Sequence, residues 1–533
     1  MLERFITSLE NAPMSVATWL AGFAGIVWIR CFLETFSSPN VSGYVASDLP
    51  TLLSYTLFYL GAALVTVLAV STFTRVRALP MVRALLFLLP IMWLAPLIDL
   101  VHGGAYIGYF VSATPTALLH EFLIYLAPVA GSGVTIGLHI ELGLLVLLLG
   151  GYVYLKTKNV TRAIVAGIVG YVVIFATVAL PSVFGFLFAV NGVGGVDALI
   201  PALQQALVAR DFFHPSEMYS AYRTVELLFA VAMAQVWYLI TAVAGFVLLY
   251  RVRRDVALAV VRNIRPERLA HYVIAAILGG LIALAEGSKV AWSIFDVITI
   301  AVAALTITFA WLFAVTVNDI VDEPIDAISN KERPLVTGAL TPSLMREVAF
   351  VSGVMTLVGA LALGSYATFW ILVFSAVAYV YSAPPLRLKR VPVLASAFIG
   401  IATLALVLLG FFLLSANQAF AIFPTPIAIV VFLFMTLLTN VRDFKDIEGD
   451  AAAGIWTVPT LLGERRARWV IGALCFVAFL LAPLFIPVPL LWVPSLIAGA
   501  AAGIGLVQGR SERLIFSLYF LYLASVVLIL AFS

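Results

Sequence analysis

Six aspartates in this very apolar chain form two triplets with the same spacing. The triplets are Asp319, Asp322 and Asp326, and Asp443, Asp446 and Asp450. A spacing of i, i+3 and i+7 can place the three carboxylates of a triplet on one face of a helix. The adjacent negative charges repel one another, and a bound cation removes this repulsion. We therefore interpret each triplet as a candidate Mg²⁺ site.

The composition indicates a multi-pass membrane protein. The chain has 533 residues, of which 63% are hydrophobic and 11% are charged. Soluble proteins contain about 25% charged residues, so the soluble class is excluded. The net charge of +3 comes from basic residues scattered over short loops, and we expect no nucleic-acid partner. Cys31 and Cys475 lie in separate apolar runs and indicate neither a disulfide nor a metal site.

Fifteen apolar runs have the length, roughly 17–27 residues, that a bilayer requires of a spanning helix. Six lie in the first half, at about 13–34, 49–74, 80–101, 134–155, 161–189 and 224–250. Nine lie in the second half, at about 269–286, 292–317, 345–364, 367–382, 393–415, 425–441, 467–484, 488–508 and 514–532. The sequence thus predicts an all-α fold in three parts. These are a six-helix membrane module at 1–250, a basic cytoplasmic linker at 251–268 and a nine-helix domain at 269–533.

The distribution of Lys and Arg predicts the orientation in the cell membrane. Every second loop is basic, at 75–83, 156–162, 251–268, 331–346, 387–390, 442–468 and 510–513. The opposite loops carry only Arg210, Arg223 and Lys289. Because basic loops stay in the cytoplasm, we expect the N-terminus and both triplets on the cytoplasmic side. After an odd number of spans the C-terminus should lie outside.

Polar and basic residues accompany both triplets. Asn318 and Asn440 precede them, and Arg333 and Lys445 follow or interleave with them. The segment 381–390 falls on the same side, where Pro-Pro should end a helix. Its Arg387 and Lys389 could reach the same site, and its Tyr381 could equally be an aromatic residue of the membrane interface. Because four spans separate the triplets, a helical bundle can bring them face to face, and two Mg²⁺ ions with flanking cations form a receptacle for a diphosphate.

Four motifs together resemble the UbiA family of intramembrane prenyltransferases over about residues 265–533. They are N-D-x-x-D-x-x-x-D at 318–326, N-K-x-R-P-L at 330–335, Y-S-x-P-P-L-R-L-K at 381–389 and D-x-x-D-x-E-G-D at 443–450. The resemblance implies Mg²⁺-dependent transfer of an isoprenyl group from an allylic diphosphate to an acceptor. The acceptor would be hydrophobic or amphipathic, such as a quinone-type aromatic or a lipid precursor. The donor's apolar chain would lie between helices and open towards lipid.

The resemblance also implies roles for particular residues. Catalytic roles fall to Asp319, Asp322, Asp443, Asp446, Arg387 and Lys389. The metal ligands would be Asp319, Asp322, Asp443, Asp446 and Asp450. Substrate contacts would come from Asn318, Asp326, Arg333, Tyr381, Asn440, Lys445 and Asp450. One departure is Pro324, which disfavours a helix at Glu323, so we expect Asp326 on the following loop.

Two other classes of protein compete with this reading. An ion-coupled transporter could use paired acidic sites, but it would hold them near the middle of the membrane in broken helices. A CDP-alcohol phosphotransferase-like enzyme would need a single D-G-x-x-A-R motif that continues into further aspartates, and this sequence has none. The N-terminal half resembles no family that we recognise. Its Asp99, His102, His139 and Glu141 could form a metal site, but we favour polar residues at the membrane interface.

Overall fold

The computed structural model describes the chain as a set of helices. It covers residues 2–37, 48–102, 109, 111–126, 135–187, 199–201, 203, 221–288, 292–391, 393–415, 419–445, 447–452 and 454–532. Across these ranges there is no strand, and 15 helices are long and apolar enough to cross a membrane. Six of them precede Arg265 and nine follow it. The predicted all-α fold is confirmed, and the chain is a multi-pass membrane protein.

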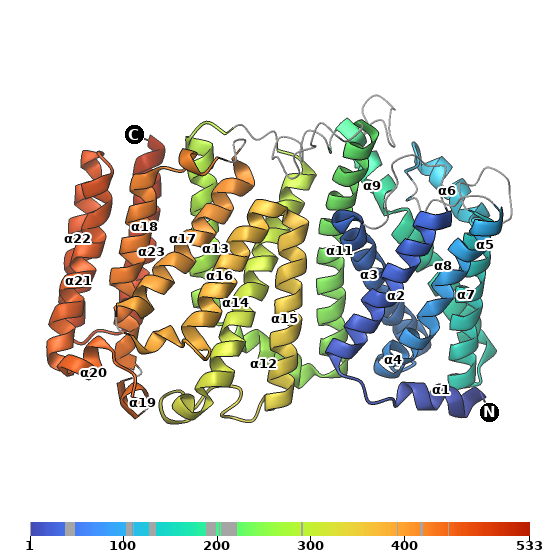
Figure 1. Cartoon of the computed structure of the whole chain (residues 1–533), viewed down its shortest axis with the longest axis horizontal. Helices are drawn as coiled ribbons and strands as arrows, with labels where there is room; N and C mark the ends of the chain where they lie inside the picture. The colour runs from blue at the N-terminus through green and yellow to red at the C-terminus, as the bar shows by residue number, and fades with distance from the viewer. Residues whose placement is uncertain are drawn as a thin grey trace. The chain divides into compact units, whose positions relative to one another are not determined.

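The first compact unit comprises Met1–Leu258, Ala291–Ala303 and Leu361–Leu363. Its main helices are α1 (Leu2–Glu10), α2 (Val16–Ser37), α3 (Leu49–Thr74), α4 (Ala78–Leu88), η1 (Leu89–Trp93), α5 (Leu94–His102), α6 (Pro115–Ile124), α7 (Ile136–Thr157), α8 (Val160–Val178), α9 (Leu180–Leu187) and α11 (Ala221–Val252) (Figure 1). The span predicted at 80–101 is divided into α4, η1 and α5. Pro90 lies in η1 and lacks the amide hydrogen that an α-helix would use there, which explains the change to a 3₁₀ turn.

Two acidic residues of this unit are buried and hydrogen-bonded within the protein. Glu141 is 3% exposed, and its Oε2 accepts a hydrogen bond of 2.6 Å from Arg30 Nη1. Asp99 is 2% exposed and accepts hydrogen bonds from the Thr135 hydroxyl and from the Gly137 amide. Both carboxylates are thus satisfied within the protein, and their location at the membrane interface stays a prediction. Among the described residues, no group of three His, Cys, Asp or Glu side chains could hold a metal.

The second compact unit comprises Ala259–Val290, Ala304–Ala360 and Gly364–Ser533. Its elements, two of which begin or end in the first unit, are α13 (Pro266–Ala285), α14 (Ile294–Ser329), α15 (Pro342–Leu363), α16 (Ser365–Ser382), η3 (Leu388–Arg390), α17 (Leu394–Leu414), η4 (Phe420–Ile422), α18 (Thr425–Leu438), η5 (Thr439–Lys445), α19 (Ile447–Ala452), α20 (Val458–Leu462), α21 (Glu464–Phe485), η6 (Pro489–Leu491), α22 (Trp492–Val507) and α23 (Glu512–Phe532). A further helix, α12 (Arg254–Asn263), contains the boundary between Leu258 and Ala259. The three-part division of the chain predicted from the sequence stays a proposal.

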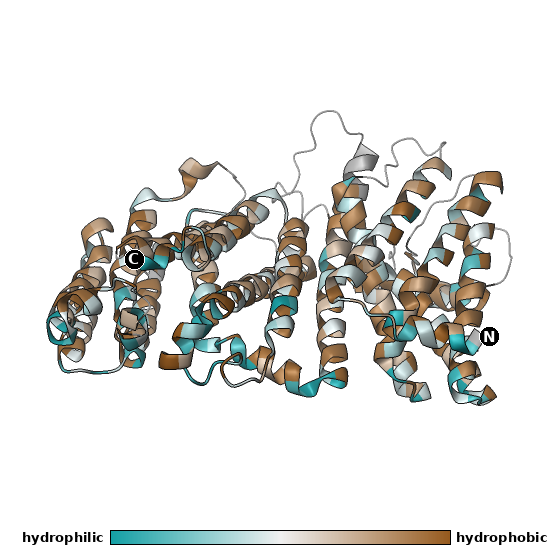
Figure 2. Ribbon diagram, turned by 60° about the horizontal axis from the view of Figure 1, so that its bottom comes forward, coloured by the Kyte–Doolittle hydropathy of each residue, from teal (hydrophilic) through white to brown (hydrophobic). Residues whose placement is uncertain are grey.

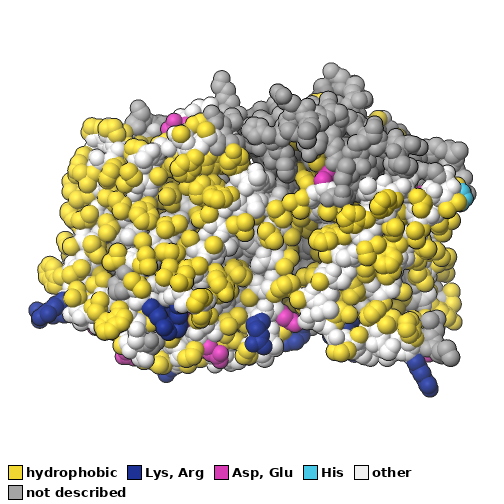
Figure 3. All heavy atoms as spheres, in the orientation of Figure 1, with side chains coloured by type: hydrophobic (Ala, Val, Ile, Leu, Met, Phe, Trp, Pro, Cys, Tyr) yellow, Lys and Arg dark blue, Asp and Glu magenta, His cyan; other side chains and the backbone are white. Residues whose placement is uncertain are grey.

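The helices of the second unit present apolar side chains outward. Ile497 and Leu521 are 66% and 68% exposed, as a lipid-facing surface requires. Hydrophobic side chains dominate the face of these helices that Figure 3 draws. Figure 2 shows hydrophobic residues along most of each long helix and hydrophilic residues gathered near helix ends. The charged side chains of this unit are thus concentrated at the ends of its spanning helices.

Helices α13 and α17 touch backbone to backbone at two glycines. A Cβ atom added to Gly279 would lie 1.8 Å from the Val407 carbonyl oxygen, and one added to Gly410 would lie 1.8 Å from the Ala276 carbonyl oxygen. Only glycine permits this approach, and small residues commonly allow membrane helices to pack closely. The two helices that carry Tyr272 and Ser396 into the site described below are fixed at this crossing.

Gly410→Ala should destabilise the second unit by about 1–3 kcal/mol, because the added methyl forces α13 and α17 apart. The matched control is Gly505→Ala in α22, where the nearest atom to an added Cβ is 3.5 Å away. Thermal unfolding of the purified protein in detergent would compare the two variants. A Gly410→Ala protein that melts no lower than the control would contradict this account of the crossing.

Candidate active site

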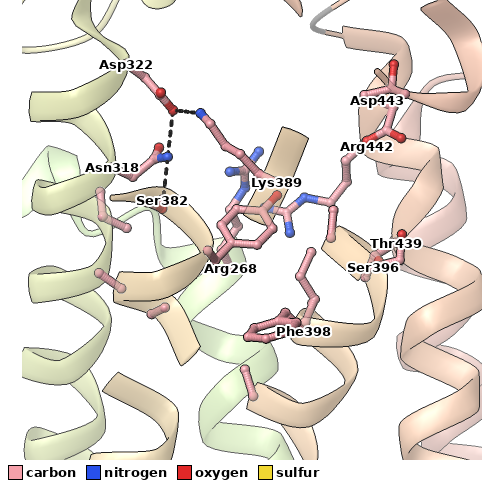
Figure 4. Close-up of a pocket in the computed structure, with 18 of the residues that line it drawn as sticks. Arg268, Asn318, Asp322, Ser382, Lys389, Ser396, Phe398, Thr439, Arg442 and Asp443 are labelled. Carbon is pink, nitrogen blue, oxygen red and sulfur yellow. Dashed lines mark hydrogen bonds and ion pairs between the residues drawn. The ribbon is translucent and has the colours of Figure 1, made fainter. Parts of the chain in front are cut away.

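A cavity of about 200 Å³ lies within the second unit and contains most of the predicted site residues. Its walls come from α13, α14, α16, η3, α17, η5 and the segment around α19 and α20. Figure 4 shows Asp322 and Lys389 on one side of this cavity and Arg442 and Asp443 on the other. Segments more than a hundred residues apart in the chain therefore meet at one site.

The first aspartate triplet lies on one continuous helix. Helix α14 runs through Pro324 and ends at Ser329, so the prediction that Asp326 lies on a loop is wrong. Asp319, Asp322 and Asp326 are all buried, with exposed fractions of 5% or less. Proline costs a helix one hydrogen bond, but it does not end a helix that tertiary packing holds in place. This triplet therefore keeps the single face that its spacing indicates.

Basic side chains cover the carboxylates of this face. Asp322 accepts a hydrogen bond of 2.7 Å from Arg387 Nη2, and it also forms an ion pair with Lys389. Asn318 Nδ2 donates to Asp322 Oδ2 at 2.7 Å. Arg265 Nη2 lies 2.5 Å from Asp319 Oδ1. The predicted cations of the third motif are thus at the site, and in this structure they contact an aspartate.

The second triplet does not share the geometry of the first. Helix α18 ends at Leu438, and the chain continues as the 3₁₀ segment η5, which contains Asp443, and then as α19, which contains Asp450. Asp446 lies outside the described residues. The expectation of one helical face is wrong for this triplet, because two types of helix divide it. Asp443 and Asp450 nevertheless both line the cavity.

Most of the other predicted residues also line the cavity. The lining includes Asn318, Asp326, Arg333, Tyr381, Lys389, Asn440 and Lys445. The amide of Asn440 is already engaged, since it accepts from Ser396 Oγ and donates to the carbonyls of Thr436 and Leu437. It therefore fastens the end of α18 to α17. Asp319 and Arg387 are outside the lining and reach the site through their ion pairs.

Three arginines of the site were missed by the sequence reasoning. Arg265, Arg268 and Arg442 line the cavity, whereas the sequence places the first two in the predicted linker and marks Arg442 only as a topology signal. Among the described lining residues, six basic side chains face four carboxylates. The position of Arg442, directly before Asp443 in the second motif, was the one available signal. Arg265 and Arg268 look in the sequence like any basic residue at the cytoplasmic end of a span.

The arginines are held where their charges are costly. Arg268 and Arg442 both line the cavity, where their positive charges repel each other. Burial lowers the pKa of the Arg265 guanidinium, and Asp319 opposes that change. Arg265 and Arg387 also adopt positive φ angles of 54° and 44°, which cost a non-glycine residue about 1–3 kcal/mol. Like charges that are confined in this way favour an anion between them.

Aromatic side chains form the apolar part of the cavity. Tyr272 lies with its ring centroid 5.0 Å from that of Trp311 and 5.1 Å from that of Phe374. All three line the cavity, together with Phe398. The faces of aromatic rings pack against hydrocarbon and also attract cations through the ring quadrupole. The cavity thus joins an anion-binding end to an apolar end.

The acidic residues fit a hard divalent cation such as Mg²⁺. Oδ2 of Asp319 and Oδ2 of Asp326 are buried without a hydrogen-bond partner among the described residues. Mg²⁺ prefers carboxylate oxygen, and it commonly takes only one or two carboxylates, completing its octahedron with water and substrate phosphate. The absence of a ready group of three acidic ligands in the described residues is therefore compatible with such an ion. Asp319, Asp322, Asp326, Asp443 and Asp450 are the described candidates.

Relatives of known name match part of the chain. The chlorophyll synthase of Avena sativa is 28% identical over 213 residues, which are 37% of this chain and 54% of that protein. The digeranylgeranylglyceryl phosphate synthase of Thermococcus kodakarensis is 32% identical over 174 residues, 32% of this chain and 59% of that protein. The chain spans about half the length of the first curated relatives that it matches.

A solved structure and a family profile also match this chain. The structure is a UbiA homolog from Archaeoglobus fulgidus bound to GPP and Mg²⁺, which aligns with 51% of this chain and 98% of its own at 18% identity. Its TM-score of 0.41 supports no residue-by-residue correspondence. The profile of the UbiA prenyltransferase family matches residues 272–531. Residues 272–531 of this chain therefore belong to the UbiA prenyltransferase family.

Proposed function

We propose that the chain transfers an isoprenyl group from an allylic diphosphate to a hydrophobic or amphipathic acceptor within the membrane, with Mg²⁺ as cofactor. One observation carries this proposal: a single cavity joins both aspartate motifs, a cluster of basic side chains and an aromatic wall. A diphosphate matches the charged end, and an isoprenyl chain matches the apolar end. The family match supports the same reaction class.

Different residues of the site would bind the diphosphate and assist the cleavage of the allylic C–O bond. Arg268, Arg442 and Lys389 would hold the diphosphate and stabilise the charge that grows on it as the allylic C–O bond breaks. Tyr272 and Trp311 would face the allylic cation and keep water from it. A bound Mg²⁺, held by the aspartates, would supply further stabilisation of the leaving diphosphate. The acceptor's nucleophile then bonds to the allylic carbon, and the acceptor gives up a proton to water or to the released diphosphate.

The ion pairs on Asp322 would change partners when the donor binds. Arg387 and Lys389 contact the carboxylate in this structure. A diphosphate would give both cations a more highly charged anion, and it would expose Asp322 to the metal. Arg387 and Lys389 can therefore stabilise Asp322 before the donor binds and contact the diphosphate after it binds.

An assay of the purified full-length protein tests the proposed reaction. The protein in lipid nanodiscs would be incubated with dimethylallyl, geranyl, farnesyl and geranylgeranyl diphosphates against phenolic and glycerol-phosphate acceptors. Mass spectrometry should detect an acceptor that has gained one isoprenyl unit, together with released diphosphate. Neither product with any pair would count against the proposal, whereas substrate movement across a vesicle membrane would favour the transporter. The orientation predicted from the basic loops, with the mouth of the site in the cytoplasm, stays a prediction.

Arg442→Gln should lower kcat/KM for the donor by about a hundredfold, because one charged hydrogen bond to the diphosphate contributes about 1.5–3 kcal/mol. The effect should appear partly as a raised KM for the donor, with the KM for the acceptor unchanged. Arg465→Gln is the matched control, since Arg465 lies exposed at the start of α21 and outside the cavity lining. Equal kinetics for the two variants would remove Arg442 from the proposed site.

A further inference from the structure

The first unit contains a second cavity, of about 190 Å³, that the proposed reaction does not use. It lies between α3, α4, η1, α7 and α8, and every residue that lines it belongs to this unit. Most of the lining is apolar, and it includes the aromatic rings of Phe58, Tyr59, Tyr125 and Tyr152. Among the described lining residues, Glu141 alone carries a charge. The cavity is thus an apolar chamber with one acidic position.

Arg30 lies behind the lining of this cavity and contacts three of the residues that form it. Its Nη1 donates to Glu141 Oε2 at 2.6 Å and also to the carbonyl of Met92. Its Cζ is 5.5 Å from the centroid of the Tyr59 ring. Glu141, Met92 and Tyr59 all line the cavity. The guanidinium therefore fixes the position of the one charged group in the chamber.

The buried charges are not balanced among themselves. Glu34 Oε1 lies 3.5 Å from Arg30 Nη2, so two carboxylates share one guanidinium. Arg30, Glu34 and Glu141 have exposed side-chain fractions of 3% or less. Glu34 Oε2 has no hydrogen-bond partner in the described structure, nor have Nε and Nη2 of Arg30. Buried carboxylates in excess are costly, and a hydrogen-bond donor beside them lowers that cost.

The size and lining of the chamber narrow the choice of ligand. An apolar cavity of about 150 Å³ is known to hold one benzene molecule, so this chamber accommodates a single substituted ring. Its four aromatic side chains can pack against such a ring. Pockets of this kind usually combine an apolar body with a few polar groups that fix orientation. Glu141 is the one charged group in the described lining, and as a carboxylate it is an acceptor, which favours a ligand with a donor.

We propose that this cavity is a binding site for a lipid-soluble phenol, whose ring occupies the apolar chamber and whose hydroxyl donates to Glu141. The site lies wholly in the first unit and does not depend on the reaction proposed for the second. A hydrocarbon would fill the chamber without using Glu141, and an ammonium compound would instead neutralise its charge. These two classes are the alternatives that the experiment must separate.

The probe is 4-propylphenol, measured by equilibrium dialysis against the full-length protein in nanodiscs, with empty nanodiscs subtracted. Propylbenzene lacks the hydroxyl, and 3-phenylpropylamine replaces it with a cation. The phenol should bind one saturable site about tenfold more tightly than either compound, as expected for a hydrogen bond to a carboxylate. Equal or tighter binding of propylbenzene or of the amine would overturn the proposal, as would the absence of saturable binding.

Two leucines of α7 locate the bound phenol. Leu145 lines the cavity, whereas Leu147 is 71% exposed and lies outside it. Leu145→Trp should abolish saturable binding, and Leu147→Trp should leave it unchanged, with thermal melting used to verify that both are folded. Ala62→Phe, which fills the same cavity from α3, provides a second obstruction if Leu145→Trp fails to fold. Binding that survives in a folded cavity-filled variant would overturn the proposal.

Two further variants test the polar contact and the choice of cavity. Glu141→Gln should reduce the preference for the phenol over propylbenzene by about fivefold or more, because a neutral amide is a weaker acceptor than a carboxylate. Asp322→Asn, in the other cavity, should leave phenol binding unchanged. Loss of binding in Asp322→Asn would place the phenol in the second unit and overturn the assignment, whatever the outcome for isoprenyl transfer.

Discussion

Asp322→Asn is expected to reduce kcat/KM for isoprenyl transfer by about ten-thousandfold, while the protein remains folded. Asp322 lines the proposed site, where it contacts Asn318, Arg387 and Lys389. An amide has nearly the same shape as the carboxylate, but it lacks the charge that would hold Mg²⁺ and orient the two basic side chains. Removing one interaction that acts on developing charge commonly costs several kcal/mol, and here three partners are affected together. Initial rates with saturating acceptor would measure the loss.

The neighbouring carboxylate provides the control for this variant. Glu323 precedes Pro324 on the same helix and is exposed. Glu323→Gln removes the same charge one position away. If the position of Asp322 in the site causes the loss, and not the change in net charge, Glu323→Gln should retain at least about half of the activity. A thermal melt of each variant separates lost catalysis from lost structure. An active Asp322→Asn enzyme would refute the assignment of this aspartate.

The sequence could predict which helices exist because that information is local. Each spanning helix needs an apolar run of fixed length, and all 15 runs have a corresponding helix among the described residues. It could also be anticipated that the two aspartate motifs meet at one cavity, because both motifs follow apolar runs at helix ends. Asp322 and Asp443 accordingly line the same cavity.

The geometry of the two motifs could not be predicted, because tertiary packing overrides local preference. Pro324 disfavours a helix in isolation, yet α14 continues through it and keeps Asp326 on the helix. No breaker stands between Leu438 and Asp443, yet the chain changes there from an α-helix to a 3₁₀ segment. The roles of Arg265 and Glu141 depended on partners far along the chain. Ion pairs of that kind leave no local pattern.

Removal of divalent metal should reduce isoprenyl transfer to background, and Mg²⁺ should restore it. The reason is electrostatic: the diphosphate and the aspartates are both negative, and without a metal they repel one another across the cavity. The buried Oδ2 atoms of Asp319 and Asp326, which lack hydrogen-bond partners, are the positions from which a cation would relieve that repulsion. The measurement is product formation after dialysis against EDTA, followed by titration with MgCl₂.

The choice of restoring ion tests whether the metal acts at these carboxylates. Ca²⁺ takes more ligands at longer distances than Mg²⁺, so it should restore much less activity at equal concentration. Mn²⁺ can replace Mg²⁺ at oxygen sites, and its electron paramagnetic resonance reports binding without turnover. Mn²⁺ should bind the wild-type protein and the Glu323→Gln variant more tightly than Asp322→Asn. Full activity in EDTA would refute the metal-dependent mechanism, and equal Mn²⁺ binding by all three proteins would move the metal away from Asp322.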